Sequence, residues 1–395
     1  MERREFVKNT GLLSTSLLLN SSVFASVSGS VIRGKLKIAV IGCGIRGNQL
    51  IDTIQSIEGI ELAAVCDVLP FRLDYALKKA DQDTIGYRDY RELLDVKKID
   101  AVVIATPFYT HEAIALSAID FGKHVYCEMT TTKGISGSRT IVEKLQDSKL
   151  IFQAGYQYRS SLLYKHIVEM INSGEIGNVI SFDCRWYGKD NWVLPVANLS
   201  LERSVNWKMY REYSGGMTSE WSSHQIDFVN WVLGENPKKI VGLGGLDFHK
   251  NSKREIYDNT HLLFEYSNGV KASFKCLFGD IPGNYEIKVI GSKGAISIDA
   301  SSAWIKFYNN NDSASFPSDS TKINKESQQK GKQLRFLHFD ADTRAMLDFK
   351  ESIDEKIQPC SNAISAGHTA IAVQLSLDAM YTGATQYWKE SHNLN

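Results

Sequence analysis

The chain has 395 residues, which favours two or three domains over one, and its 43% hydrophobic and 23% charged residues exclude a disordered or collagen-like chain. Basic and acidic residues both number 45, and this zero net charge gives no indication of nucleic-acid binding. No run of 18 apolar residues occurs, so we expect no membrane-spanning helix. The six cysteines lie far apart and form no CxxC pair, so we expect neither a disulfide framework nor a metal site.

The first 30 residues have the three parts of an export signal. A charged segment at residues 3–8 is followed by a mildly apolar stretch at 11–25 and then by small residues. The pair Arg3-Arg4, followed by Phe and Lys, resembles a twin-arginine signal, for which we expect cleavage after Ala25. The alternative is an amphipathic N-terminal helix. We therefore expect a periplasmic protein that folds before export, which agrees with unpaired cysteines.

A glycine-rich turn lies between a predicted strand and a predicted helix. The β-branched run at 35–41 leads into Gly42-Cys43-Gly44-Ile45-Arg46-Gly47, and a second strand at 61–66 ends at Asp67. Asp67 follows Gly47 by 20 residues, which is the spacing of a dinucleotide-binding fingerprint. There the first glycine allows the turn, the second lets the backbone approach a pyrophosphate, and the third lets helix pack on strand. The alternative is a glycine-rich turn without a ligand.

The expected cofactor is NAD. The Asp67 carboxylate would accept hydrogen bonds from both ribose hydroxyls and repel a 2′-phosphate, whereas the nearby Arg72 leaves NADP open. The positive N-terminal end of the helix would face the pyrophosphate beside Ile45 and Arg46. Because an exported protein has no pool of free NAD to draw on, we expect the cofactor to be tightly bound.

Strands and helices alternate up to about residue 152. A helix at 90–94 precedes an apolar strand at 100–105, and a helix at 111–121 precedes a strand at 123–127. Apolar strands of this kind are typical of a parallel sheet covered on both faces, which predicts a Rossmann domain over residues 31–152. Ligands of such sheets bind at the carboxyl ends of the strands. The expected cofactor-binding residues are Gly42, Gly44, Ile45, Arg46, Gly47, Asp67, Thr106, Pro107, His111 and Glu128.

Residues 153–395 are predicted to form an α+β domain. Strand-like runs follow one another closely and Ser267-Asn268-Gly269 is a hairpin turn, which indicates an open, mainly antiparallel sheet. The polar segment at 309–332 is expected to be a mobile loop. Helices are expected at 162–173, 216–233, 342–356 and 365–389, and strands at 179–187, 239–245, 260–266, 270–277, 285–290 and 295–298.

In combination these motifs resemble the Gfo/Idh/MocA oxidoreductases, which include glucose–fructose oxidoreductase and inositol dehydrogenase. The resemblance rests on residues 42–47, Asp67, residues 87–90, residues 105–111 and residues 122–128. It implies a Rossmann domain followed by a substrate-side domain, whose exposed sheet face commonly makes dimers or tetramers. We therefore expect a homo-oligomer.

The segment at 215–227 contains the candidate catalytic residues. If it is helical, Glu220, His224 and Asp227 lie on one face at positions i, i+4 and i+7. A carboxylate one turn from an imidazole can hold its tautomer and raise its basicity, as a general base requires. The resemblance implies that His224 takes the substrate hydroxyl proton and that Glu220 orients it. Without the resemblance, such spacing more often indicates a surface pair.

One position departs from the family pattern. Where the family has Glu-Lys-Pro, with the lysine meeting substrate and nicotinamide, this chain has Glu128-Met129-Thr130. Residue 129 therefore offers no ammonium group to polarise a substrate oxygen, and Lys133 lies three residues beyond this motif. NAD-dependent glycoside hydrolases of the same fold also lack this lysine, so the substitution keeps a second function open.

The expected substrate-binding residues lie in the first half of the second domain. Residues after the strand at 150–154 match the place where relatives put substrate contacts, and aromatic side chains next to arginines suit a sugar. The alternative is that the aromatic residues belong to the core. The residues we expect to contact substrate are Gln157, Arg159, Tyr210, Arg211 and Asp227.

Three functions are compatible with these motifs. The one we expect is an NAD(P)-dependent oxidoreductase that transfers a hydride to or from a secondary hydroxyl or keto carbon of a sugar or glycoside. The second is redox-neutral glycoside hydrolysis, in which oxidation, elimination, hydration and reduction follow one another. The third is a sugar-binding protein with a relict dinucleotide fold, against which the intact glycine loop, Asp67 and the pair Glu220 and His224 argue.

Overall fold

The computed structural model describes residues 34–189, 192–250, 253–279, 285–299, 302–308, 331–334 and 340–395. The expected export signal at 1–30 and all but the last two residues of the expected loop at 309–332 lie outside these described residues. None of the described helices is long and apolar enough to cross a membrane. In the same part of the chain, no three His, Cys, Asp or Glu side chains are grouped so that they could hold a metal ion.

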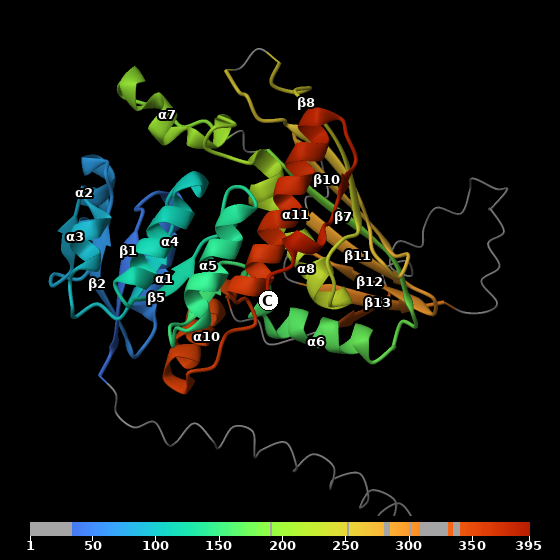
Figure 1. Cartoon of the computed structure of the whole chain (residues 1–395), viewed down its shortest axis with the longest axis horizontal. Coiled ribbons are helices and arrows are strands. Elements are labelled where there is room, and N and C mark those ends of the chain that lie inside the picture. Colours follow the sequence, from blue (N-terminus) through green and yellow to red (C-terminus); the bar gives the residue numbers. More distant parts are fainter. Residues whose placement is uncertain are drawn as a thin grey trace, which may run out of the picture.

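The N-terminal domain is built on a six-stranded parallel sheet with the strand order β3-β2-β1-β4-β5-β6 (Figure 1). The order changes direction between β1 and β4, which is where open α/β sheets bind ligands. Strand β4 is buried at every residue and β1 at all but one, as their apolar sequences predict. The strands are β1 (Leu36–Ile41), β2 (Ile60–Cys66), β3 (Ile85–Tyr87), β4 (Ala101–Ile104), β5 (His124–Cys127) and β6 (Phe152–Ala154).

Helices cover both faces of this sheet, and one of them comes from the far end of the chain. Helix α10 (Ala341–Glu355) lies beside α1 (Ile45–Ser56), and its buried Met346 and Phe349 join the core around Ile38. The C-terminal part of the chain thereby closes the Rossmann domain. The other helices of this domain are α2 (Pro70–Lys79), α3 (Tyr90–Leu94), α4 (His111–Asp120) and α5 (Ser136–Gln146).

The second domain is a nine-stranded sheet with the order β14-β13-β12-β11-β7-β10-β9-β8-β15. Its described strand pairs are antiparallel except for β7 with β10. Strands β8 to β10 alternate buried and more exposed residues, because only one face of the sheet is covered. The strands are β7 (Val179–Gly188), β8 (Lys239–Gly245), β9 (Asn259–Glu265), β10 (Lys271–Phe278), β11 (Tyr285–Gly291), β12 (Gly294–Ile298), β13 (Ala303–Phe307), β14 (Lys332–Leu334) and β15 (Gln386–Tyr387).

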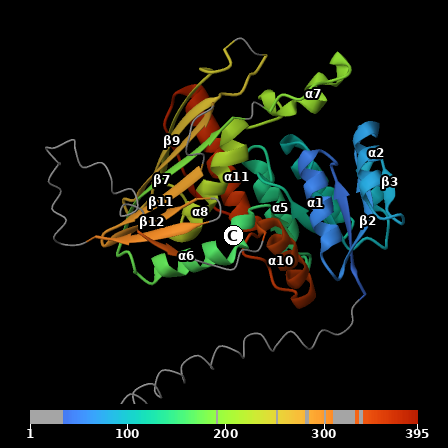
Figure 2. The same cartoon turned by 180° about the vertical axis from the view of Figure 1, so that it is seen from behind.

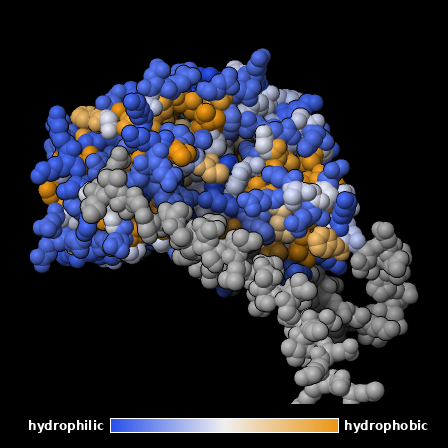
Figure 3. Space-filling view, turned by 90° about the horizontal axis from the view of Figure 1, so that it is seen from below, coloured by the Kyte–Doolittle hydropathy of each residue, from blue (hydrophilic) through white to orange (hydrophobic). Residues whose placement is uncertain are grey.

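Three helices fill the space between this sheet and the Rossmann domain. They are α6 (Leu162–Asn172), α8 (Ser223–Leu233) and α11 (Ala363–Thr382), and α11 packs on β8 on one side and on α5 on the other. Figure 2 shows the same arrangement from behind, and the described helices all lie on the inner side of the sheet. From below, hydrophilic residues predominate on the surface and hydrophobic ones gather in separate patches (Figure 3). A short helix, α7 (Glu202–Val205), lies in the connection between β7 and α8.

The expected fold class, a Rossmann domain followed by an α+β domain with an open, mainly antiparallel sheet, is confirmed. Two expected boundaries are wrong. The Rossmann sheet continues through β6 to Ala154, past the expected limit at residue 152. Helix α11 ends at Thr382 instead of continuing to 389, because Gly383 takes a left-handed conformation with φ of 71° that caps the helix. Strands β13 to β15 have no counterpart among the expected strands.

Candidate active site

The glycine loop has the geometry of a dinucleotide-binding turn. Gly42 has a φ of 97°, and a Cβ there would lie 2.6 Å from the carbonyl carbon of Ala105. A Cβ at Gly47 would lie 1.8 Å from the carbonyl oxygen of Gly42, so helix and strand can approach only because both residues are glycines. At Gly44, by contrast, a Cβ would meet nothing described within 3.8 Å, and the nearest atom is Nη1 of Arg72. The backbone at Gly44 is therefore open to the approach of a ligand.

Asp67 is held beside this loop by the backbone. Its Oδ2 accepts a hydrogen bond of 2.8 Å from the amide of Cys43, and its Oδ1 accepts one of 2.8 Å from the amide of Leu69. The carboxylate thus lies at the carboxyl end of β2 next to the start of α1. Ile45 begins α1 and is 66% exposed, and no side chain of the described residues caps this helix end, so its first amides remain available to a phosphate.

The loops that follow β4 and β5 are joined by His111. Its ring nitrogens lie 2.8 Å from the carbonyl oxygen of Thr106 and 2.9 Å from that of Thr130, and the residue is buried. The hydroxyl of Thr110 lies 2.7 Å from both Thr106 Oγ1 and the carbonyl oxygen of Pro107. His111 therefore supports the two loops at the ligand-binding edge of the sheet, while Thr106 and Pro107 lie in the first of them.

Arg46 and Glu128 contact each other at the same edge. Nε of Arg46 donates to Oε1 of Glu128 at 2.8 Å, and its two terminal nitrogens donate to the carboxylate of Asp342 in α10 at 2.5 and 2.8 Å. The guanidinium thus connects α1, the end of β5 and α10. Asp342 is absent from the sequence-based candidates, because no motif marks it and it lies 296 residues from Arg46 in the chain.

His224 lies at the start of α8, where this helix meets the Rossmann domain. Its neighbour Ser223 has its Oγ 3.4 Å from Sδ of Met129, just beyond β5. The ring of Tyr156, just beyond β6, stands edge-on to the imidazole with centroids 5.8 Å apart. The candidate base is therefore placed at the carboxyl ends of β5 and β6, on the side where the glycine loop also lies.

The surroundings of His224 keep its imidazole neutral. Burial lowers the pKa of His224 to about 4, the positive charge of Arg46 acts in the same direction, and Asp342 opposes it. Its Nδ1 is buried and has no hydrogen-bond partner among the described residues. Rings of Tyr158 and Trp186 lie 5.3 and 5.9 Å from the imidazole. At neutral pH the imidazole is therefore uncharged.

The expected contact of Glu220 with His224 is wrong. The carboxylate of Glu220 instead forms an ion pair of 2.6 Å with Nζ of Lys208. Lys208 lies within reach of the Glu220 carboxylate and is its ion-pair partner. Residues Thr218–Ser222, which precede α8, form a π-helical turn, so Glu220 and His224 do not belong to one regular α-helix.

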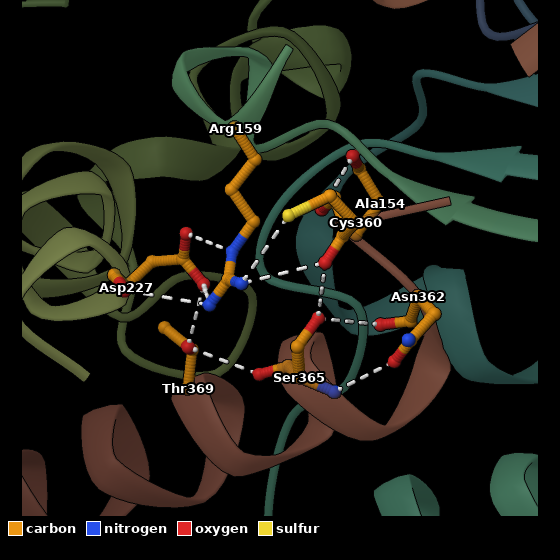
Figure 4. A network of polar contacts seen from close by, with 8 residues as sticks. Ala154, Arg159, Asp227, Cys360, Asn362, Ser365 and Thr369 are labelled. Carbon is orange, nitrogen blue, oxygen red and sulfur yellow. Dashed lines mark hydrogen bonds and ion pairs between the residues drawn. The ribbon is translucent and has the colours of Figure 1, made fainter. Parts of the chain in front are cut away.

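Arg159 and Asp227 contact each other rather than an open site. Nε and Nη2 of Arg159 donate to the Asp227 carboxylate at 2.7 and 3.0 Å, and Thr369 Oγ1 donates to it at 3.0 Å (Figure 4). Arg159 is 6% exposed and Asp227 2%, so a substrate could reach neither without breaking the pair. Nη1 of Arg159 also donates to the carbonyl oxygen of Cys360 at 3.3 Å. Their expected role as substrate-binding residues does not agree with this arrangement.

The other expected substrate residues are dispersed. The hydroxyl of Tyr210 donates to Glu202 at 3.0 Å, and the guanidinium of Arg211 lies 3.5 Å from the ring centroid of Tyr381. Gln157 is half-buried and follows Tyr156, and its Oε1 has no partner among the described residues. Of these three, only Gln157 belongs to the segment next to His224.

Lys133 does not supply the ammonium group that Met129 lacks, because its own ammonium group is bound elsewhere. Its Nζ donates to the carbonyl oxygen of Arg211 at 3.0 Å and to that of Glu212. Lys133 thereby ties the Rossmann domain to the second domain. Tyr156 is not among the residues predicted for the site. Its position directly after a parallel strand could have indicated it, because ligands bind at the carboxyl ends of such strands.

Two family models match the chain. Residues 36–156 match the oxidoreductase family with an NAD-binding Rossmann fold, and residues 164–297 match the GFO/IDH/MocA C-terminal domain. Together these segments make up more than half of the chain.

Several curated proteins are similar to it. An uncharacterized oxidoreductase of Streptococcus pneumoniae is 27% identical over 67% of this chain and 68% of its own length. Inositol 2-dehydrogenase of Salmonella typhimurium is 27% identical over 52% of this chain, and the match spans 56% of that enzyme. A 2,7-anhydro-N-acetylneuraminate hydratase of Mediterraneibacter gnavus is 25% identical over 66% of both chains.

Solved structures share the fold over nearly the whole length. Levoglucosan dehydrogenase in complex with NADH has a TM-score of 0.72 at 16% identity, covering 89% of this chain and 99% of that one. The myo-inositol 2-dehydrogenase of Lactobacillus plantarum has a TM-score of 0.70 at 19% identity, covering 90% and 100%. With both of its domains matched, the chain belongs to the Gfo/Idh/MocA family of NAD(P)-binding oxidoreductases.

Proposed function

We propose that this protein is an NAD-dependent oxidoreductase that transfers a hydride to or from a secondary hydroxyl or keto carbon of a sugar or glycoside. One observation carries the proposal: a buried, neutral His224 lies at the same edge of the Rossmann sheet as the open glycine loop. Relatives named inositol 2-dehydrogenase and levoglucosan dehydrogenase support a polyhydroxylated ring as substrate.

The loop residues fit a dinucleotide. The open backbone at Gly44 and the uncapped amides of α1 suit a pyrophosphate, and the fixed carboxylate of Asp67 suits two ribose hydroxyls. Asp67 favours NAD over NADP because its charge would repel a 2′-phosphate, while Arg72 lies near enough to Gly44 to moderate that preference. When bound, the nicotinamide supplies the hydride acceptor or donor.

His224 is the residue we assign to proton transfer. Its neutral form is available throughout the neutral range, and Nδ1 has no competing partner among the described residues. The rings of Tyr156, Tyr158 and Trp186 enclose it and restrict water, which strengthens a hydrogen bond to a substrate hydroxyl. Gln157 lies close by and is the sequence-based substrate candidate that the geometry favours most.

The redox-neutral reaction remains the second candidate, and two observations favour it. Met129 supplies no ammonium group where most of the family has lysine, and Lys133 is engaged with backbone carbonyls of residues 211 and 212. In addition, one relative is named a hydratase, a class of enzyme that adds water without net oxidation. In such a cycle the keto group formed first would be reduced again before the product leaves.

A single set of assays separates these functions. The purified protein is analysed for bound nucleotide by mass spectrometry and then incubated with free sugars, inositol, levoglucosan or an aryl glycoside. Reduction of NAD by a free sugar or inositol supports the oxidoreductase, whereas release of the aryl group without added acceptor supports the redox-neutral cycle.

Gly44→Ala should keep the fold and weaken NAD binding at least about tenfold, since the space there is open to the ligand alone. If the protein carries no bound nucleotide and turns over none of these compounds, both functions are contradicted.

We also propose that the protein is exported by a twin-arginine signal and retains its cofactor tightly. The pattern of residues 1–30 supports this. The test is to fuse these residues to a reporter that is active only in the periplasm and compare it with an Arg3→Lys/Arg4→Lys variant. Equal export of both fusions would contradict the proposal.

A further inference from the structure

A strip of partly buried tryptophans leads away from His224. The ring centroid of Trp186, on β7, lies 5.9 Å from that of the imidazole. Trp221 stacks on Trp186 at 5.6 Å with the two rings within 8° of parallel, and Trp192 stands edge-on to Trp221 at 5.3 Å. We call Trp186, Trp221 and Trp192 the tryptophan strip. It begins at the candidate base and runs from it through rings in direct contact.

The strip lies at the end of the inner face of the sheet, outside the fully buried core. Phe182 and Cys184 on β7 are buried in the large core of the second domain, whereas Trp186, the next residue on the same face, is only partly buried. Trp221 and Trp192 are partly buried too. All three therefore keep part of their surface within reach of a ligand, unlike the core residues beside them.

The fold fixes the far end of the strip. The side chain of the buried Asn206 accepts a hydrogen bond of 2.7 Å from the amide of Leu194 and donates one of 3.0 Å to its carbonyl oxygen. These bonds hold the segment after Trp192 beside the segment that begins at Trp207. Trp192 itself has a φ of 58°, a left-handed conformation that costs energy for a residue other than glycine and is enriched at ligand sites. The surrounding structure thus keeps this ring in place at an energetic cost.

Lys208 adds a charged group at this end of the strip. Its Nζ lies 5.1 Å from the ring centroid of Trp192 and 5.5 Å from that of Trp207, and it forms the ion pair of 2.6 Å with Glu220. The side chain of Lys208 is 35% exposed and that of Glu220 is 10% exposed. An ammonium group has three donors and Glu220 accepts from one of them, so Lys208 can also donate to a ligand hydroxyl.

We propose that the tryptophan strip and Lys208 form a subsite for a second ring of the substrate, so that the protein acts on neutral glycosides or disaccharides in preference to free monosaccharides. The inference rests on the proposed function, because it takes the ring beside His224 to be the one whose carbon exchanges the hydride. The C–H faces of a pyranose are apolar and pack on aromatic rings, while its hydroxyls need donors such as the ammonium group of Lys208. Glu220 compensates the charge of Lys208, so the subsite favours a neutral ring over an acidic one.

The test compares ligands that differ by one ring. Isothermal titration calorimetry with the full-length protein in the presence of NAD measures the binding of glucose, galactose and N-acetylglucosamine. It then measures cellobiose, maltose, lactose, chitobiose and the p-nitrophenyl glycosides of the same sugars. At least one two-ring ligand should bind the wild type about tenfold more tightly than its one-ring counterpart. Tenfold corresponds to about 1.4 kcal/mol, which is the size expected for one aromatic contact.

Four variants locate the preference. Trp192→Leu removes the aromatic ring but keeps an apolar side chain, so the preference for two rings should fall to about threefold or less, while Trp192→Phe should retain most of it. Lys208→Met removes the donor without touching the strip, should also lower the preference, and serves where Trp192→Leu does not fold. The matched control is Trp388→Leu, because Trp388 is also partly buried but packs edge-on to His368 near the end of the chain. This control should keep the wild-type preference, and circular dichroism checks that each variant is folded.

The outcomes separate this inference from the proposed function. If every two-ring ligand binds the wild type no more tightly than its one-ring counterpart, or if folded Trp192→Leu keeps the full preference, the inference is overturned. The second result would mean that the strip is only part of the hydrophobic core. A preference that depends on Trp192 in a protein that binds no NAD would contradict the proposed function alone. Reduction of NAD by monosaccharides with no preference for two rings would overturn this inference and leave the proposed function standing.

Discussion

Glu220 and His224 are four residues apart, yet no hydrogen bond or ion pair joins their side chains in the described part of the chain. The Glu220 carboxylate lies 2.6 Å from Nζ of Lys208, while Nδ1 of His224 is buried and has no partner among the described residues. A π-helical turn, Thr218–Ser222, precedes α8, so the two residues do not belong to one regular α-helix. Within the described residues, aromatic rings rather than the orienting carboxylate that the family resemblance implies surround His224.

This separation predicts different consequences for the two residues. His224→Gln should lower the rate of NAD reduction at least about 10²-fold, because it removes the proton acceptor. Glu220→Gln should stay within roughly tenfold of the wild type, since its carboxylate pairs with Lys208 and not with His224. Single-turnover absorbance of the reduced nicotinamide, with inositol or levoglucosan as probes, measures both. An equal loss in the two variants would mean that Glu220 acts on His224 after all.

The pKa of His224 also predicts how stability depends on pH. Well above pH 6.5 the imidazole is neutral in both the folded and the unfolded chain, so it does not change the free energy of unfolding there. As the pH falls from 6.5 towards 4, the unfolded chain takes up a proton that the folded protein does not accept, and stability is lost. Between pH 7 and pH 5 this amounts to about 2 kcal/mol.

Urea unfolding of wild type and His224→Gln at pH 7 and pH 5 checks this sign. The variant should lose less stability on acidification than the wild type does. His368, whose pKa burial also lowers to about 4, makes the same contribution in both proteins and therefore cancels in the comparison. Identical losses would show that His224 is not protected from protonation in the folded state.

Local patterns predicted the fold well, whereas contacts between distant segments had no signal in the sequence. The predicted strand at 239–245 coincides with β8, because alternating apolar and polar residues are typical of a strand covered on one face. The predicted glycine loop is also present, because only glycine fits the close backbone approach at Gly42 and Gly47. Gly383 is a signal in the sequence for the end of α11, because glycine readily takes the left-handed conformation that caps a helix. The bonds of Arg46 to Asp342 depend on where α10 packs, which no local motif encodes. The π-helical turn before α8 likewise depends on packing and not on spacing.

The buried pair of Arg159 and Asp227 predicts a structural role. Asp227→Asn should destabilise the protein by about 3–5 kcal/mol, because it leaves a buried guanidinium without its counter-charge. The exposed pair of Arg203 and Glu212, 2.8 Å apart, is the matched control, and Glu212→Gln should leave the stability nearly unchanged because water screens the pair. Urea unfolding measures both. A stable Asp227→Asn protein with impaired sugar binding would instead restore the sequence-based assignment of Asp227 to the substrate.

The open face of the second sheet predicts self-association. Its strands expose Leu243 on β8 and Leu263 on β9, at 70% and 51%, while the opposite face is covered by helices. Apolar side chains gathered on an uncovered sheet face are typical of an interface between protein chains, and a second copy would supply a matching surface. We expect light scattering after size exclusion to show an oligomer for the wild type and a smaller species for Leu243→Glu/Leu263→Glu. Ile357→Glu, which changes an equally exposed apolar residue away from the sheet, should leave the oligomer intact. A monomeric wild type, or a double variant of unchanged mass, would show that this face is not the interface.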